Sequence, residues 1–300
     1  PAGTGKQRFA AALAARLLCA GAGERPCGAC RSCHLAGAGT HPDLHAVSPE
    51  EDRRQIGIEQ IRALIEQVGL TAHFGGAKVV VLHPAEMMTR AAANTLLKTL
   101  EEPPGDSVFV LVADAASRLP ATVRSRCQIV DFPLPAAAQA LPWLAERLGG
   151  AGEPERLLAL ADGAPMAALA LAEGGGLATR EAVLEDVLAL IAGRGDPVST
   201  AARWEKLGPG GVLAWLGSLT CDAIRLKNGR TAHKLTHADR ASAMHDLARG
   251  LDLKALFEVL DLVTEASRAV AGRASLNELL LLERITIAWS RLACSRGRAG

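Results

Sequence analysis

Four cysteines close together in the sequence constrain the fold of this chain more than any other feature. Cys19, Cys27, Cys30 and Cys33 follow the spacing C-x7-C-x2-C-x2-C, so two C-x2-C pairs share Cys30. The residues between the last three cysteines are small or polar, which allows the loop to turn its thiolates inward around one ion. Four sulfurs would complete a tetrahedral coordination sphere, as in structural sites. The spacing therefore predicts one structural zinc ion bound by these cysteines.

Two disulfides or four unrelated thiols are the alternatives to a metal site. The chain has 7 cysteines, an odd number, and the alanine-rich helical pattern after Lys6 contains no secretory cleavage signal. These features indicate a reducing compartment, the cytoplasm, where disulfides are rare. Clustering argues against unrelated thiols. His34 and His41 could replace a ligand, but neither is needed beside four thiolates.

A degenerate phosphate-binding loop begins the sequence. Gly5 and Lys6 match the end of the pattern G-x-x-x-x-G-K-[ST], and a helical pattern follows directly. The first glycine of the pattern and the buried strand that normally precedes it would lie before Pro1, so we expect the chain to be a fragment. Gln7 occupies the position of the hydroxyl that holds Mg²⁺, which leaves ATP binding in doubt.

A second part of ATPase chemistry is missing after the apolar run 78–82. In P-loop ATPases an acidic pair follows this strand, one carboxylate for Mg²⁺ and one for the attacking water. Here His83 and Pro84 occupy those positions. Glu86 lies further along, where we expect a solvated helix-cap residue. The sequence predicts that this chain is not an active ATPase.

The pattern of strands and helices predicts an α/β fold. Apolar runs at 44–47, 78–82, 108–112 and 127–132 predict strands, and helical patterns alternate with them. This order is typical of a doubly wound parallel sheet. After residue 133 only helical patterns follow, separated by glycine clusters. We expect an α/β domain over 1–133, a small helical domain over 134–178 and a larger all-helical domain over 179–300, with no membrane-spanning segment.

Three polar residues are further candidates for function. Arg126 lies where a short helix meets the run 127–132, and an arginine there could reach a neighbouring subunit's nucleotide site. The residues alone favour a plain surface arginine, or one paired with Asp131 or Glu102. Asn94 and Lys98 lie one helical turn apart. They could contact a partner or DNA, although a solvated helix face is the simpler interpretation.

A family resemblance resolves these alternatives. The run from Ala91 to Pro104, the pair Leu119 and Pro120, and Ser125-Arg126-Cys127 resemble the bacterial clamp-loader subunits of DNA polymerase III, as does a four-cysteine insertion after the phosphate-loop helix. This AAA+ family contains an ATP-hydrolysing motor branch, tau/gamma, and a delta prime branch whose nucleotide site is usually degenerate. Gln7, His83 and Pro84 resemble the delta prime branch, as does the stretch 163–169, which has no nucleotide-sensing arginine.

The resemblance implies a complete architecture and role. It implies a RecA-like AAA+ domain with a zinc module at 19–33, a helical lid and an oligomerisation collar. It also implies a hetero-pentamer with motor and delta subunits that loads the sliding clamp onto primer-template DNA. Arg126 would act in trans, while Gly5 and Lys6 would be remnants of a phosphate site. Membership of a DNA-directed DNA polymerase holoenzyme follows, although no paired polymerase carboxylates are visible in this chain.

Two rival functions remain to be compared with this one. The first, an active motor subunit of the same complex, is disfavoured by Gln7, His83 and Pro84. An unrelated zinc-ribbon DNA-binding protein disagrees with the formal net charge of +1 and the 3% aromatic content. Nucleic-acid binding of that kind draws on basic patches and stacking aromatic side chains.

Overall fold

A parallel sheet organises residues 1–134 in the computed structural model of this protein. Within the described residues its strands are β1 (Leu44–Val47), β2 (Lys78–Leu82) and β3 (Ser107–Leu111), in the order β1-β2-β3. Both pairings are parallel, with Val79 aligned to Leu44 on one side and to Val108 on the other. The predicted α/β class with a parallel sheet is confirmed.

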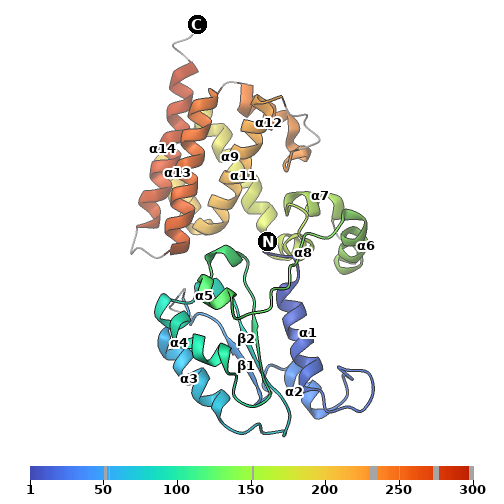
Figure 1. Cartoon of the computed structure of the whole chain (residues 1–300). Helices are drawn as coiled ribbons and strands as arrows, with labels where there is room; N and C mark the ends of the chain where they lie inside the picture. Colours follow the sequence, from blue (N-terminus) through green and yellow to red (C-terminus); the bar gives the residue numbers. More distant parts are fainter. Residues whose placement is uncertain are drawn as a thin grey trace. The chain divides into compact units, whose positions relative to one another are not determined.

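Helices cover both faces of this sheet (Figure 1). Val80 and Leu82 of β2 pack against α3 (Ile58–Gly69) and α4 (Arg90–Glu101). Val79 points to the opposite face, where it packs against Ala14 and Leu18 of α1 (Lys6–Leu18). Alternate residues of one strand are thus buried on opposite faces, which explains why this strand is a continuous apolar run.

Shorter elements complete this part of the chain. They are α2 (Arg31–Gly37), α5 (Ala121–Arg124) and two 3₁₀ turns at Ala85–Met87 and Ala116–Arg118. The structure describes residues 1–50, 53, 55–150, 152–229, 235–249, 251–272 and 277–296. Residues 1–134 and 135–300 form two separate compact units, which are described individually.

The predicted strand at 127–132 is not formed. These residues lie in no helix or strand, and the side chains of Ile129 and Val130 are 64% and 61% exposed. A strand needs a neighbour that completes its backbone hydrogen bonds. No described strand pairs with this segment, so its backbone is not part of the sheet.

The described residues after 134 form helices joined by turns, as predicted. The helices are α6 (Ala137–Leu148), α7 (Pro154–Leu160), α8 (Pro165–Glu173), α9 (Gly176–Ile191), α10 (Pro197–Leu207), α11 (Pro209–Lys227), α12 (Ala241–Arg249), α13 (Leu253–Gly272) and α14 (Glu278–Arg296), with a 3₁₀ turn at Ala238–Arg240. None of the helices in the described part of the chain is both long and apolar enough to span a bilayer.

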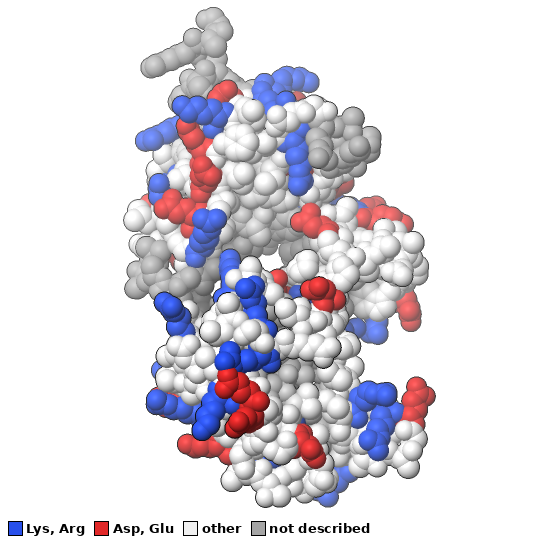
Figure 2. Space-filling model, viewed as in Figure 1, with Lys and Arg blue, Asp and Glu red and all other residues white. Residues whose placement is uncertain are grey.

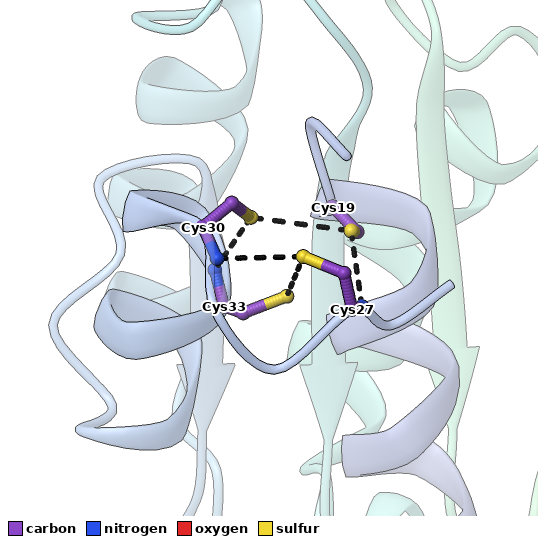
Figure 3. A group of neighbouring side chains, drawn as sticks. All are labelled: Cys19, Cys27, Cys30 and Cys33. Carbon is purple, nitrogen blue, oxygen red and sulfur yellow. Dashed lines mark hydrogen bonds between the residues drawn. The ribbon is translucent and has the colours of Figure 1, made fainter. Parts of the chain in front are cut away.

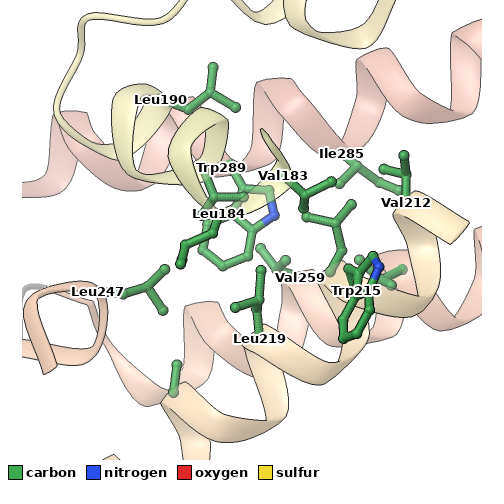
Figure 4. Close-up of a cluster of buried hydrophobic side chains, with 14 of the residues drawn as sticks. Val183, Leu184, Leu190, Val212, Trp215, Leu219, Leu247, Val259, Ile285 and Trp289 are labelled. Atoms are coloured by element: carbon green, nitrogen blue, oxygen red, sulfur yellow. The ribbon is translucent and has the colours of Figure 1, made fainter. Parts of the chain in front are cut away.

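Two hydrophobic clusters stabilise this helical unit. The smaller one joins α6, α7 and α8 around Leu144 and Ala168, which are fully buried. The larger one joins α9 to α14 (Figure 4). It includes Trp204 and Trp289, both fully buried, and Trp215, which is 8% exposed.

A buried ionic network also connects the helical elements. The Arg180 side chain on α9 has no exposed surface, and its Nη1 and Nη2 atoms lie 2.9 and 2.7 Å from the two carboxylate oxygens of Asp239. Arg156 of α7 lies 3.0 Å from the same carboxylate. Asp239 therefore joins α7 and α9 through two guanidinium groups. A bidentate contact is the strongest geometry for such a pair.

His237 is the titratable centre of this network. Arg180 Nε donates a hydrogen bond to His237 Nδ1 over 2.9 Å, and His237 Nε2 lies 3.0 Å from Ser218 Oγ. Nδ1 must therefore be unprotonated. Burial and the nearby charge of Arg180 lower the pKa of His237 to about 4.

The stability of the helical unit should fall between pH 6.5 and pH 4. The unfolded chain takes up a proton on His237 near pH 6.5, whereas the folded chain resists protonation down to about pH 4. The unfolded state thus binds more protons in this window, and stability rises with pH across it. We expect His237 to account for a loss on the order of 3 kcal/mol on acidification.

Urea unfolding followed by tryptophan fluorescence at pH 7 and pH 4 measures this loss, because all four tryptophans lie in the helical unit. In His237→Gln the corresponding part of the pH dependence should disappear. Equal pH dependence in both proteins would contradict the assignment.

Candidate functional site

The four predicted metal ligands lie together at the end of α1 and the beginning of α2. Their Sγ atoms all lie within 4.8 Å of one another, and they point toward a common centre (Figure 3). Cys19 Sγ lies 3.9 Å from Cys30 Sγ, and Cys27 Sγ lies 4.0 Å from Cys33 Sγ. A tetrahedron with Zn–S bonds of about 2.3 Å has edges of about 3.8 Å. The cluster could therefore hold a metal ion.

Backbone hydrogen bonds and burial shift the pKa values of these thiols in different directions. Backbone N–H groups of Cys33 and Ala20 lower the pKa of Cys30 to about 6. N–H groups of Cys27 and Gly21 also lower the pKa of Cys19. Burial and a hydrogen bond with Cys30 raise the pKa of Cys33 to about 12. Thiolates this close repel one another, so a bound cation would favour full deprotonation of the set.

Two glycines shape the loop around the sulfurs. Gly28, between two of the ligands, has φ +70°, a left-handed conformation that glycine adopts without strain. A Cβ atom on Gly21 would lie 3.0 Å from Cys27 Sγ and 3.4 Å from Cys19 Sγ. Gly21 therefore allows the chain to pass close to the cluster.

The degenerate phosphate loop lies at the other end of α1. Gly5 is the N-cap of this helix with φ 97°, and Lys6 is its first residue. Lys6 Nζ forms an ion pair of 2.7 Å with Asp114, which follows β3, and also contacts the Pro1 carbonyl. Its side chain is only 13% exposed. The ammonium that would bind phosphate is thus already neutralised by a carboxylate.

Gln7 and His83 form a second internal contact at this edge of the sheet. The side-chain nitrogen of Gln7 lies 2.5 Å from His83 Nδ1. These two residues occupy the positions expected for a magnesium-binding hydroxyl and an acidic residue, and the structure brings them together. Neither supplies an anionic oxygen, which Mg²⁺ prefers.

Glu86 is not the solvated residue expected from the sequence. Its Oε1 accepts hydrogen bonds from the backbone N–H groups of Asp114 at 2.9 Å and Ala115 at 3.2 Å, and its Oε2 is buried. Glu86 therefore fixes the turn after β3 and with it the position of Asp114. Because the turn's two backbone N–H groups need acceptors, the carboxylate is drawn inward.

Arg126 lies two residues after α5 and has a partner within the same unit. Its Nε donates to Glu101 Oε1 over 2.5 Å, Nη2 contacts the same oxygen, and Nη1 donates to the Thr122 carbonyl over 2.9 Å. The alternative partners considered above, Asp131 and Glu102, are not the ones observed. The Arg126 side chain remains 33% exposed.

A cavity of about 860 Å³ extends between the phosphate loop and this arginine. Lys6, Asp114 and Arg126 all line it, together with apolar side chains of α1 and β3. Asp114 and Glu101 were not identified from the sequence, since nothing in a local pattern links them to Lys6 or Arg126. Asn94 and Lys98 are exposed on α4.

On the face drawn in Figure 2, the charges of the described residues do not single out a nucleic-acid interface. On the face drawn in Figure 2, basic and acidic side chains of the described residues are interspersed, and no continuous area of one sign covers it. This agrees with the net charge of +1. Non-specific DNA binding by a single chain depends on such an area.

Sequence comparisons place the chain among known proteins. Residues 1–136 match the family described as "DNA polymerase III, delta subunit", and residues 175–291 match its C-terminal family. The DNA polymerase III subunit delta' of Pseudomonas aeruginosa is 38% identical over 97% of this chain and 90% of its own length. That of Escherichia coli K12 is 35% identical over 93% and 84%. The subunit tau of Bacillus subtilis is 32% identical over 44% of this chain and 23% of its own length.

Replacement of Asp114 should open the phosphate loop to anions. In Asp114→Asn the Lys6 ammonium loses its charged partner, so binding of a triphosphate no longer requires breaking that pair. We expect the affinity for tripolyphosphate, measured by titration calorimetry, to rise by roughly fivefold, as for a pair worth about 1 kcal/mol. Asp106→Asn, an exposed change of equal charge, serves as the control. Equal affinities in all three proteins would show that Asp114 does not block the loop.

Proposed function

This chain belongs to the delta' family of DNA polymerase III clamp-loader subunits, and we propose that it works there without hydrolysing ATP itself. In this proposal Arg126 enters the nucleotide site of a neighbouring motor subunit. The observation that carries the proposal is the contrast between two sites. Lys6 of the chain's own phosphate loop is paired with Asp114 and 13% exposed, whereas Arg126, although it contacts Glu101, is 33% exposed.

Two independent features oppose hydrolysis in this chain. Gln7 and His83 stand where Mg²⁺ would need oxygen ligands, and Lys6 is paired with Asp114 at 2.7 Å. Hydrolysis needs the metal, an oriented water and a cation on the phosphates. The delta' relatives that match 83% to 97% of this chain support the same proposal.

Arg126 has the properties that an arginine finger requires. A planar guanidinium can bind two phosphate oxygens at once and stays charged at any physiological pH. Arg126 lies two residues after the short helix α5 and is held by Glu101, the Thr122 carbonyl and the Ser125 hydroxyl. A partner's phosphoryl group offers more negative charge than a single carboxylate, so exchange toward the partner is favourable.

The partners follow from membership of the clamp loader. We propose that the chain assembles with tau/gamma motor subunits and a delta subunit in a hetero-pentamer that loads the sliding clamp onto primer-template DNA. The division into an AAA+ domain (1–133), a lid (134–178) and a collar (179–300) is part of this proposal. The cluster around α9 to α14 supplies a large, rigid helical body for the collar role.

Zinc is the metal that we propose for the four cysteines. A closed set of four thiolates leaves no position for water or substrate, and zinc accepts this ligand set without a redox step. The ion would join the end of α1 to the beginning of α2. Its role would be structural, because it would stabilise a loop that otherwise has few apolar residues to bury.

Loss of Arg126 should reduce ATP turnover by the assembled clamp loader. In Arg126→Ala the motor site that faces this subunit loses its finger, and such a loss costs about 10³-fold or more at the affected site. Turnover by the whole complex should fall by that site's share, while assembly remains stoichiometric. Steady-state ATPase assays with clamp and primed DNA, together with size-exclusion chromatography, measure both quantities.

Arg118→Ala provides the matched control, since Arg118 is an exposed arginine of the same unit. It should leave turnover unchanged. Unaltered turnover in Arg126→Ala would end the finger proposal, and failure of the wild-type chain to enter the complex would end the assembly proposal.

Purified protein should contain one equivalent of zinc. Elemental analysis measures the metal, and Cys30→Ser should lose most of it because one of the four ligands is weakened. Chelation should lower the melting temperature of the wild type but not of this variant. Less than about half an equivalent, with four titratable thiols in the cluster, would contradict the site.

A further inference from the structure

The partner of Arg126 within its own subunit suggests how the finger is controlled. Resting on the proposed function of Arg126, we propose that Glu101 is a positioning residue that holds the guanidinium in the free subunit and releases it to a neighbour's phosphates. Glu101 would thus compete with the phosphoryl group for the same donors. The finger would be engaged only when that group is present.

Glu101 contacts the atoms of Arg126 that a phosphate group would bind. Glu101 Oε1 accepts from Arg126 Nε over 2.5 Å and also contacts Nη2. Nε and Nη2 form one of the edges by which a guanidinium binds phosphate oxygens side by side. That edge cannot bind phosphate while Glu101 occupies it. The Thr122 carbonyl binds Nη1 instead and can remain bound during the exchange.

The location of Glu101 makes the contact easy to break. Glu101 is the last residue of α4, and a carboxylate gains no support from the partial negative charge at a helix C-terminus. The two side chains are 33% and 48% exposed, so water and salt screen their attraction. Pairs of this kind contribute little, equivalent to at most about fivefold in an equilibrium.

In the free subunit the contact with Glu101 restricts the conformations of the Arg126 side chain. Arg126 lines a largely apolar cavity, and an unpaired guanidinium beside apolar surface has many conformations. Glu101 from α4 and the Thr122 carbonyl of α5 together limit it to one. The arginine is therefore held near the position from which it is used, at a small cost of release.

Removing the carboxylate charge should make the finger engage more readily. In the reconstituted clamp loader, Glu101→Gln should raise ATP turnover at the motor site that faces this subunit by about twofold to fivefold at limiting ATP, because release of Arg126 no longer opposes phosphate binding. Turnover by the whole complex should rise by that site's share. Glu102→Gln removes the same charge from the neighbouring exposed position and should leave turnover unchanged. Added salt should reduce the difference between wild type and Glu101→Gln.

A double variant separates this proposal from a structural effect. In the Arg126→Ala background, Glu101→Gln should no longer change turnover, because its effect acts only through the arginine. The proposal would be overturned if Glu101→Gln assembled normally but its turnover was equal to or below that of the wild type. A gain that persists without Arg126 would also overturn it. If Arg126→Ala alone changes nothing, the finger proposal fails; if it lowers turnover but Glu101→Gln raises nothing, only the role of Glu101 fails.

Discussion

Burial of β2 on both faces is the constraint on which the first unit depends. Because Val79 packs against α1 while Val80 and Leu82 pack against α3 and α4, the strands must run parallel with helices between them. Their carboxyl ends then meet at one edge, beside the first turn of α1. The same packing that stabilises the sheet therefore brings residues after β2 and β3 to the phosphate loop.

What those positions carry decides the chemistry at this edge. Lys6 pairs with Asp114 and Gln7 contacts His83, so these side chains form a set of mutual polar contacts. Glu86 extends the set by fixing the backbone of Asp114. Arg126, which lies just beyond α5, also lines the cavity and is 33% exposed.

Helix α1 connects this edge to the cysteine cluster. The helix begins with Lys6 and ends one residue before Cys19, so a metal ion bound there would fix the far end of the element that carries the phosphate loop. In the helical unit, a buried network of polar side chains fixes the elements instead of a cysteine cluster. There Arg180, Asp239 and His237 join helices that are distant in sequence through buried hydrogen bonds, which fixes their relative positions.

The sequence by itself determined the features that depend on spacing and residue type. The cysteine cluster, the strand at 78–82, the helical second half and the replaced residues Gln7 and His83 are all visible locally. Tertiary structure alone decided which side chains meet. Asp114 and Glu101 contact partners far along the chain, and ion pairs of this kind leave no periodic signal in the sequence. It also decided that 127–132 forms no strand, because an apolar pattern specifies a buried surface, whereas a strand also requires a neighbouring backbone to bond.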